Sequence, residues 1–211
     1  MDLPAPNQAR DRALLAAIVL AQWTFLYNTV DWATSCRARV WLLETAVDRM
    51  VPLVTPWVYI YSVAYPCCLA PVFLVTLPRL RTACFAYTFA MVVSLATFVV
   101  MPVGMPRPYA PPDAYGASIL AITWAVDRPF NCFPSLHVSF AFLSAFVTWT
   151  ERPRAGGALL VMAVLIGAST MYVKQHWFLD VVAGALLAGL AFRLARQPRI
   201  RQLLSDDQSA K

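Results

Sequence analysis

The sequence predicts an all-α membrane protein, and three features of its composition point to this fold class. Of the 211 residues, 60% are hydrophobic and only 13% are charged, whereas about a quarter of the residues in a soluble domain are charged. The apolar residues gather in stretches near the roughly 20 residues that cross the core of a bilayer. The charged residues lie between those stretches. We therefore expect residues 1–211 to form one domain, a polytopic bundle of six transmembrane helices.

Six apolar stretches are near the length of a membrane span, and each should be helical because a span in lipid must satisfy its own backbone hydrogen bonds. They cover residues 13–30, 56–77, 83–103, 134–150, 156–173 and 177–192. In the second stretch, Pro66 and Pro71 should kink the helix. The first stretch follows arginines, as a secretory signal does, but its length and its polar residues Gln22 and Asn28 favour a retained helix.

Two connections between the spans show helical patterns of their own. One side of residues 36–52 is apolar at about 100° per residue, which predicts an interfacial amphipathic helix between the first two spans, or a helix that covers the end of the bundle. That side consists of Val40, Leu43, Ala46, Val47, Met50 and Val51. The longest connection covers residues 104–133, where five prolines exclude one continuous helix. Within it, we expect a short helix over residues 116–125.

The positive charges predict the orientation in the membrane. With six spans, eleven of the 17 arginines and lysines lie on the side of the two termini, so the positive-inside rule places both termini in the cytoplasm. Anionic lipid headgroups at that face account for the net charge of +6, and no nucleic acid partner is expected. Cys36 and Cys132 fall on the outer side and could form a disulfide in an oxidising compartment.

The first of two polar stretches lies at the start of the fourth span. It reads "FPSLH" and contains His137, one of only two histidines in the chain. Proline is favoured at the first position of a helix, so we expect Pro134 to open the span at the outer boundary. The unpaired N–H groups of a first helical turn form an anion site, to which Ser135 adds a hydroxyl donor. A phosphate group would suit this position.

The second polar stretch, "KQHWFLD", lies between the fifth and sixth spans and contains the other histidine. His176 and Asp180 are four residues apart and so are neighbours on one face of a helix. A carboxylate bonded to one imidazole nitrogen fixes the tautomer and leaves the other nitrogen free to attack. Lys174 and Arg107 lie at the same outer boundary, so these side chains can converge with His137 on one anionic ligand.

These stretches resemble the signatures of the type 2 phosphatidic acid phosphatase superfamily, which are Lys-x6-Arg-Pro, Pro-Ser-Gly-His and Ser-Arg-x5-His-x3-Asp. Arg107 and the proline after it match the end of the first signature, but Val100 occupies its lysine position. Leu136 replaces the glycine of the second signature, and Thr170 replaces the arginine of the third. The resemblance covers about residues 85–195, agrees with a six-span fold, and is nearest to the inositol phosphorylceramide synthase branch.

The resemblance implies a reaction that uses neither a metal nor another cofactor. His176 would attack the phosphorus of a lipid phosphate and form a phosphohistidine, with Asp180 orienting the ring. His137 would protonate the leaving alcohol and then activate water or a second alcohol. The implied ligands of the phosphate oxygens are Arg107, Ser135 and Ser169, and we expect Lys174 to compensate for the arginine missing at Thr170. Asn131 and Asp127 are either contacts to the substrate headgroup or structural residues of the loop.

Several alternatives stay open at this stage. With water as acceptor, the protein is a phosphatase for a phosphatidate-like or prenyl (di)phosphate lipid. With a lipid alcohol as acceptor, it is a phosphotransferase. We favour the phosphatase because no second lipid site is evident. A metal site of His137, His176 and Asp180 is disfavoured because Arg107 and Lys174 would repel a cation. A transporter that uses these groups as an ion path is the remaining alternative.

Overall fold

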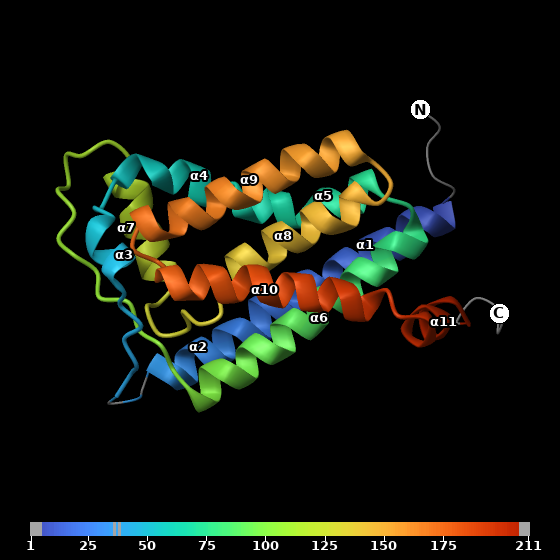
Figure 1. Cartoon of the computed structure of the whole chain (residues 1–211), viewed down its shortest axis with the longest axis horizontal. Coiled ribbons are helices and arrows are strands. Elements are labelled where there is room, and N and C mark those ends of the chain that lie inside the picture. Colours follow the sequence, from blue (N-terminus) through green and yellow to red (C-terminus); the bar gives the residue numbers. More distant parts are fainter. Residues whose placement is uncertain (1–5, 36, 38, 207–211) are drawn as a thin grey trace.

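The computed structural model describes residues 6–35, 37 and 39–206, and within these ranges all regular secondary structure is helical apart from two isolated bridges. Figure 1 shows long helices side by side along the long axis of the molecule. The short helices α3 (Ala46–Met50) and α7 (Ala117–Val126) lie at one end, and the start of α1 (Pro6–Ala21) and α11 (Pro198–Asp206) lie at the other. The predicted all-α class is confirmed.

Five helical stretches in the described part of the chain are long and apolar enough to cross a membrane. They are Gln8–Ser35, Thr55–Leu74, Leu77–Val100, Pro153–Tyr172 and Phe178–Ala195. The chain is therefore an integral membrane protein. The predicted span over residues 134–150 is the apolar helix α8 (Leu136–Trp149), which has only 14 residues, so the count of six spans stays a prediction.

The first two of these stretches contain irregularities. In the first, α1 continues through a π-helical segment η1 (Gln22–Tyr27) into α2 (Asn28–Ser35). The second consists of η2 (Thr55–Trp57), α4 (Val58–Ser62) and α5 (Ala64–Leu74). Pro66 has no N–H to donate to the carbonyl of Ser62, and the helix is interrupted at Val63, whereas Pro71 lies inside α5. The other three stretches are α6 (Leu77–Val100), α9 (Pro153–Tyr172) and α10 (Phe178–Ala195).

The short helix α8 lies at the centre of the bundle. It packs against α5, α6, α9 and α10, and eleven of its 14 residues are buried. A helix that is apolar all round is suited to such a position, because other helices rather than water or lipid cover every side of it. The first turn of α8 contains His137, so this histidine lies at one end of the central helix.

A glycine allows α10 to approach the start of α8. A Cβ atom on Gly184 would lie 2.6 Å from the backbone oxygen of Ser135, closer than any side chain permits. At the same crossing, the backbone N–H of Ser135 donates to the carbonyl of Asp180 at 3.1 Å, and the hydroxyl of Ser139 donates to the carbonyl of Gly184 at 3.0 Å. These contacts hold the first residues of α8 against the first residues of α10.

The amphipathic helix predicted over residues 36–52 is wrong for most of its length. Among its described residues, only Ala46–Met50 is helical. Trp41 instead lies in an extended segment, where its N–H donates to the carbonyl of Pro102 at 2.8 Å and its carbonyl accepts from the N–H of Gly104 at 2.9 Å. Pairing with another segment has overridden the helical period. The short helix expected over residues 116–125 is confirmed as Ala117–Val126.

Candidate active site

The two histidines meet at the end of the bundle where α8 and α10 begin and α9 ends. Their ring centroids are 5.7 Å apart, and both side chains are buried. His137 belongs to the first turn of α8, and His176 lies two residues before α10. The close crossing of these two helices at Gly184 therefore brings together residues that are 39 positions apart in the sequence.

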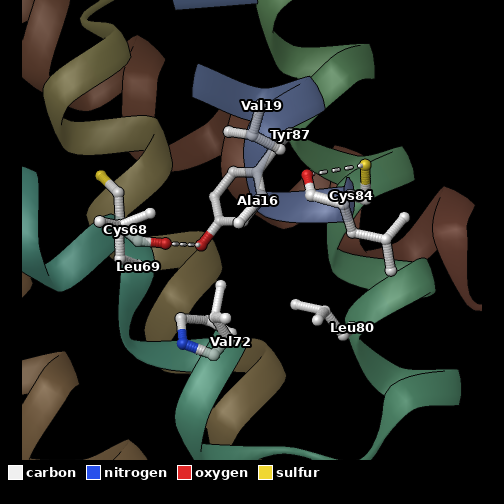
Figure 2. A pocket seen from close by; sticks show the side chains of 10 residues that line it. Ala16, Val19, Cys68, Leu69, Val72, Leu80, Cys84 and Tyr87 are labelled. Atoms are coloured by element: carbon white, nitrogen blue, oxygen red, sulfur yellow. Dashed lines mark hydrogen bonds between the residues drawn. The ribbon is translucent and has the colours of Figure 1, made fainter. Parts of the chain in front are cut away.

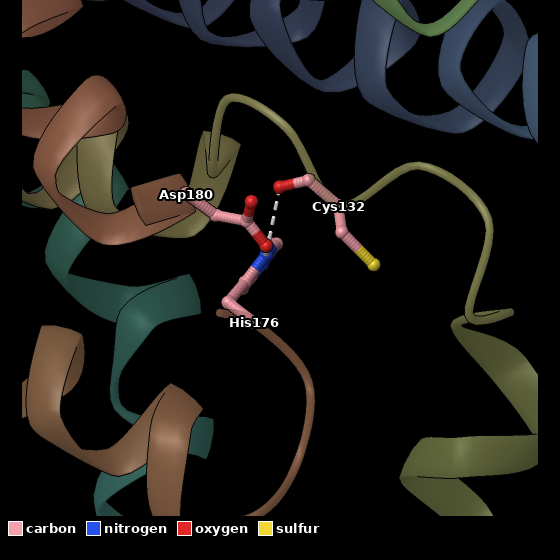
Figure 3. A group of neighbouring side chains, drawn as sticks. All are labelled: Cys132, His176 and Asp180. Carbon is pink, nitrogen blue, oxygen red and sulfur yellow. Dashed lines mark hydrogen bonds and ion pairs between the residues drawn. The ribbon is translucent and has the colours of Figure 1, made fainter. Parts of the chain in front are cut away.

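The ring of His176 is held by two oxygen atoms. Its Nδ1 lies 2.9 Å from the backbone oxygen of Cys132 and 3.5 Å from Oδ2 of Asp180 (Figure 3). A carbonyl oxygen can only accept a hydrogen bond, so in the neutral ring Nδ1 carries the proton and Nε2 has the free lone pair. Asp180 is fully buried, and its Oδ2 also accepts the N–H of Trp177 at 2.8 Å, which joins the carboxylate to the start of α10.

The ring of His137 is surrounded by aromatic side chains. Its Nε2 lies 2.8 Å from the hydroxyl of Tyr61 on α4. The rings of Trp23 and Tyr65 stand edge-on to the imidazole, with centroids 5.4 and 5.8 Å away. Tyr61 also donates to the carboxylate of Asp127 at 3.0 Å. His137 thus faces a hydrogen-bonded partner on one side and apolar ring edges on others.

Arg107 is held by backbone carbonyls close to the histidines. Its guanidinium donates to the carbonyls of Trp124 and Asp127, and at 3.0 Å to the side-chain oxygen of Gln175. Burial lowers the pKa of Arg107 from its ordinary value, and the charge of Asp127 acts in the opposite direction. Within the described residues, Nε of Arg107 and Nε2 of Gln175 are buried donors without a partner. Two N–H donors are thus available to an anion.

The other predicted phosphate ligands are engaged elsewhere. Lys174 donates from Nζ to the carbonyl of Val51 at 2.5 Å. Burial lowers the pKa of Lys174, while the carboxylates of Asp48 and Glu44 favour its charged form. Ser169 donates to the carbonyl of Ile166 inside α9 at 2.7 Å. The structure does not bring either side chain to His176 as a free donor.

Ser135 is the N-cap of α8 rather than part of its first turn. Its Oγ accepts the N–H of Val138 at 3.4 Å, and the helix begins at Leu136. The expectation that Pro134 opens the helix is therefore wrong, because the serine oxygen satisfies a first-turn N–H and places the proline outside the helix. In this contact the hydroxyl of Ser135 is the acceptor, so it keeps its own hydrogen to donate.

Residues 79–200 match the PAP2 superfamily, a range that contains the three signatures and both histidines. The chain belongs to the PAP2 superfamily. The family inferred from the three motifs is thereby confirmed. The protein is similar to the putative undecaprenyl-diphosphatase YbjG of Escherichia coli, with 34% identity over 110 residues, 51% of this chain and 53% of that protein. It is also similar to the inositol phosphorylceramide synthase catalytic subunit aur1 of Schizosaccharomyces pombe, with 34% identity over 111 residues, 51% of this chain and 26% of that protein.

The fold of this PAP2 protein also matches a solved structure. The crystal structure of Aquifex aeolicus LpxE superimposes with a TM-score of 0.51 and 16% identity, and the match covers 80% of this chain and 93% of that one. This likeness concerns the arrangement of helices. The chain spans only 53% and 26% of the lengths of the bacterial and yeast relatives.

Asn131 and Asp127 fasten the long connection of the PAP2 protein to its first span. Asn131 donates to Asp31 at 3.3 Å and accepts the hydroxyl of Thr34 at 2.8 Å. Asp127 accepts the hydroxyl of Tyr27 at 2.5 Å in addition to that of Tyr61. The sequence left two roles open for them, as contacts to the substrate headgroup or as structural residues of the loop. Their contacts in the structure match the structural role. Cys36 lies outside the described residues, and with it the suggested disulfide to Cys132.

A cluster of potential metal ligands does not fit a metal ion. Single ligand atoms of Cys132, His176 and Asp180 all lie within 4.8 Å of one another (Figure 3). A metal at this place would need the lone pair of Nδ1 of His176, but Nδ1 carries a proton when it donates to the Cys132 carbonyl. It would also need Cys132 as a thiolate. Burial and the charge of Asp180 raise the pKa of the Cys132 thiol well above its ordinary value. The donor set therefore favours hydrogen bonding over metal ligation.

Sequence reasoning missed the residues that the first two spans contribute. Tyr27, Tyr61 and Trp23 look like ordinary aromatic residues of a membrane span, and no short motif marks them. The available signal was Asp31, an acidic residue directly after the first apolar stretch and inside the helical stretch Gln8–Ser35, because an ionisable group in a span is a functional candidate. Gln175 carries no charge and belongs to no motif, so the sequence points to its neighbours Lys174 and His176 instead.

Proposed function

We propose that this PAP2 protein removes the phosphate from a lipid phosphate through a phosphohistidine on His176. The observation that supports it most is the contact of Nδ1 of His176 with the Cys132 carbonyl and Asp180. This contact leaves Nε2 of the neutral ring unprotonated, in a ring whose centroid is 5.7 Å from that of His137. In the first step, Nε2 forms a bond to phosphorus while the bond from phosphorus to the lipid oxygen breaks. The electron pair of that bond stays on the leaving oxygen.

His137 supplies the proton movements of both steps. As an imidazolium it gives a proton to the leaving oxygen, so that a phosphate ester releases a neutral alcohol and a prenyl diphosphate releases a prenyl monophosphate. As a neutral ring it then takes a proton from water while the water oxygen bonds to phosphorus. The phosphorus–nitrogen bond breaks, its electron pair returns to Nε2 of His176, and inorganic phosphate is released. The ring centroids are 5.7 Å apart, so both rings can reach one phosphoryl group.

The charge of the phosphoryl group is met by buried donors. Nε of Arg107 and Nε2 of Gln175 are the two buried donors without a partner noted above, and Ser135 keeps its hydroxyl hydrogen. Donors already in place when charge develops stabilise a transition state without reorganising at that moment. Gln175 thus takes the role that the sequence suggested for Lys174, next in the chain to the nucleophile.

The bundle contains a small apolar cavity near the site. Figure 2 shows it between α1, α5 and α6, lined by residues that include Ala16, Val19, Cys68 and Val72. Val19 lies one helical turn before Trp23, and Cys68 lies about one turn after Tyr65, the two aromatic residues whose edges face His137. The cavity is too small to hold a hydrocarbon chain, so a lipid substrate is supported by the relatives and by the apolar spans around the site.

The acceptor and the lipid class follow from the relatives only as proposals. A prenyl diphosphate substrate is supported by the similarity to a putative undecaprenyl-diphosphatase, and a phosphatidate-like lipid is the second choice. Transfer to a lipid alcohol, with the same two histidines, is supported by the similarity to the catalytic subunit of inositol phosphorylceramide synthase. We place the site at the outer face, with both termini in the cytoplasm.

The test uses the purified full-length protein in detergent with a prenyl diphosphate, a phosphatidate and a panel of alcohol acceptors. We expect release of inorganic phosphate that is insensitive to chelators and absent from His176→Ala. With radiolabelled substrate, an acid-labile phosphoryl-enzyme should form in the native protein and build up in His137→Ala. Full activity of His176→Ala, or activity that a chelator abolishes and a divalent metal restores, would contradict the proposal. Formation of a new phospholipid in place of phosphate would identify the transferase.

A further inference from the structure

A buried chain of hydrogen bonds runs from Asp127 through Tyr61 to His137. The hydroxyl of Tyr61 lies 3.0 Å from Oδ2 of Asp127 and 2.8 Å from Nε2 of His137. Tyr61 has no exposed surface, and the exposed fractions of Asp127 and His137 are 9% and 3%. The three residues come from α4, the connection after α7, and α8, so the fold rather than local sequence assembles this chain.

The direction of each hydrogen bond is fixed by the carboxylate. Asp127 can only accept, and its two oxygens take the hydroxyl hydrogens of Tyr61 and of Tyr27, the latter at 2.5 Å. Because the hydrogen of Tyr61 points to Asp127, the oxygen of Tyr61 accepts from His137. In the neutral ring, the proton of His137 is therefore on Nε2, and the lone pair is on Nδ1.

The buried carboxylate has an electrostatic consequence for this ring. A buried charge is costly unless its hydrogen bonds are satisfied, and two tyrosines satisfy those of Asp127. Arg107 donates to the backbone carbonyl of Asp127 and not to its carboxylate, whose two oxygens accept from the tyrosines. The negative charge of Asp127 thus attracts a positive ring at His137, at one hydroxyl's distance. Tyr65 and His176 are the other titratable groups that face this imidazole.

We propose that Tyr61 positions His137 for general acid and base catalysis, by fixing its tautomer and linking its imidazolium to Asp127. This inference rests on the proposed function, and Tyr61 is a positioning residue because it acts only through His137. In the first step the proton on Nδ1 of the imidazolium moves to the leaving oxygen, and the ring keeps its proton on Nε2. In the second step Nδ1 takes a proton from water. Tyr61 and Asp127 keep their own protonation states throughout.

The test compares two substrates that differ in their need for an acid. A lipid phosphate ester leaves as an alkoxide that must be protonated, whereas a nitrophenyl phosphate ester leaves as a stable anion. The ratio kcat/KM reports the steps up to loss of the leaving group. For Tyr61→Phe we expect kcat/KM to fall about 10- to 100-fold with the lipid ester, part of the 10²- to 10⁴-fold that an acid–base group contributes. With the nitrophenyl ester we expect a fall of less than about threefold, since that step needs little acid.

Tyr27→Phe is the matched comparison, because it removes a hydroxyl from the same carboxylate without touching His137. It should lower kcat/KM for both substrates by the same small factor, and Asp127→Asn should reproduce the selective loss of Tyr61→Phe. An equal loss with both esters in Tyr61→Phe, or no loss with either, would overturn the inference. Thermal unfolding of each variant shows that it is folded. Failure of the proposed function is distinct from this outcome, because His176→Ala would then keep its activity.

Discussion

At the scale of single residues, the orientation of His176 depends on more than the aspartate that the sequence indicates. The four-residue spacing of His176 and Asp180 predicts their pairing, and they are 3.5 Å apart. The shorter contact of Nδ1, however, is to the carbonyl of Cys132 at 2.9 Å. A backbone carbonyl supplied by a loop 44 residues away leaves no mark in a motif. Two acceptors therefore fix one tautomer.

Because Nδ1 has two acceptors, we expect Asp180→Asn to lower turnover less than the same change does in enzymes where one carboxylate alone orients the histidine. Removing such a group can lower turnover about 10⁴-fold when it also changes the tautomer. Here the Cys132 carbonyl still accepts the proton of Nδ1, so we expect kcat to fall only about 10²-fold. The variant should also lose about 1 kcal/mol of stability, because Asp180 accepts the N–H of Trp177 at the start of α10. Steady-state kinetics against His176→Ala measure this, and equal losses in the two variants would contradict it.

The adjacent residues Lys174 and Gln175 give opposite predictions for the phosphate site. Gln175→Leu removes a buried donor of similar size and should raise KM about tenfold or more, as loss of a hydrogen bond to a charged group costs about 1.5–3 kcal/mol. Lys174→Met should raise KM much less, because Nζ donates to the carbonyl of Val51. Inhibition by inorganic phosphate or vanadate provides a second measure. The reverse order of effects would restore Lys174 as the ligand suggested by the sequence.

At the scale of elements, apolar period and length predict the helices, while contacts between segments decide the exceptions. Five of the six apolar stretches are helices of spanning length, and Pro66 interrupts the second. Residues 36–52 also have a helical period, yet Trp41 pairs with Pro102 and Gly104 in extended conformation. Long-range pairing of this kind depends on where the first and third spans end relative to each other. No pattern within a single segment contains that information.

Two glycines of α10 give a matched test of how its crossing with α8 assembles the site. A Cβ atom on Gly184 would lie 2.6 Å from the Ser135 oxygen, while one on Gly189 would meet nothing within 4 Å. We expect Gly184→Ala to lower stability by about 1–3 kcal/mol through overpacking and to reduce activity by displacing His137. Gly189→Ala should be neutral or up to about 1 kcal/mol stabilising through helix propensity. Thermal unfolding in detergent and phosphate release measure both, and equal behaviour of the two variants would show that the crossing is not tight.

At the scale of the whole molecule, α8 joins the end that bears the histidines to the opposite end of the bundle. The turn after α8 contains Glu151, whose carboxylate accepts the N–H of Thr76 at 2.7 Å and its hydroxyl at 2.6 Å, in the turn between α5 and α6. Figure 1 shows that the start of α1 and α11 lie at this end, away from α3 and α7. The segment that contains α8 thus reaches the same end of the bundle as the spanning stretch Thr55–Leu74, even though α8 itself has only 14 residues. Extended residues before it and the turn after it supply the missing length.

This arrangement predicts that α8 crosses the membrane, and reporter fusions test it together with the orientation. We expect green fluorescent protein inserted after Glu151, or fused to the C-terminus, to fluoresce in bacterial cells, because both positions would be cytoplasmic. Alkaline phosphatase inserted after Pro112, in the connection before α7, should be active because that connection would be external. If α8 did not cross, Glu151 would share the side of Pro112, and fluorescence would be lost at Glu151. A C-terminal fusion on the side opposite to the N-terminus would likewise exclude six spans, since only an even number returns the chain to the side on which it began.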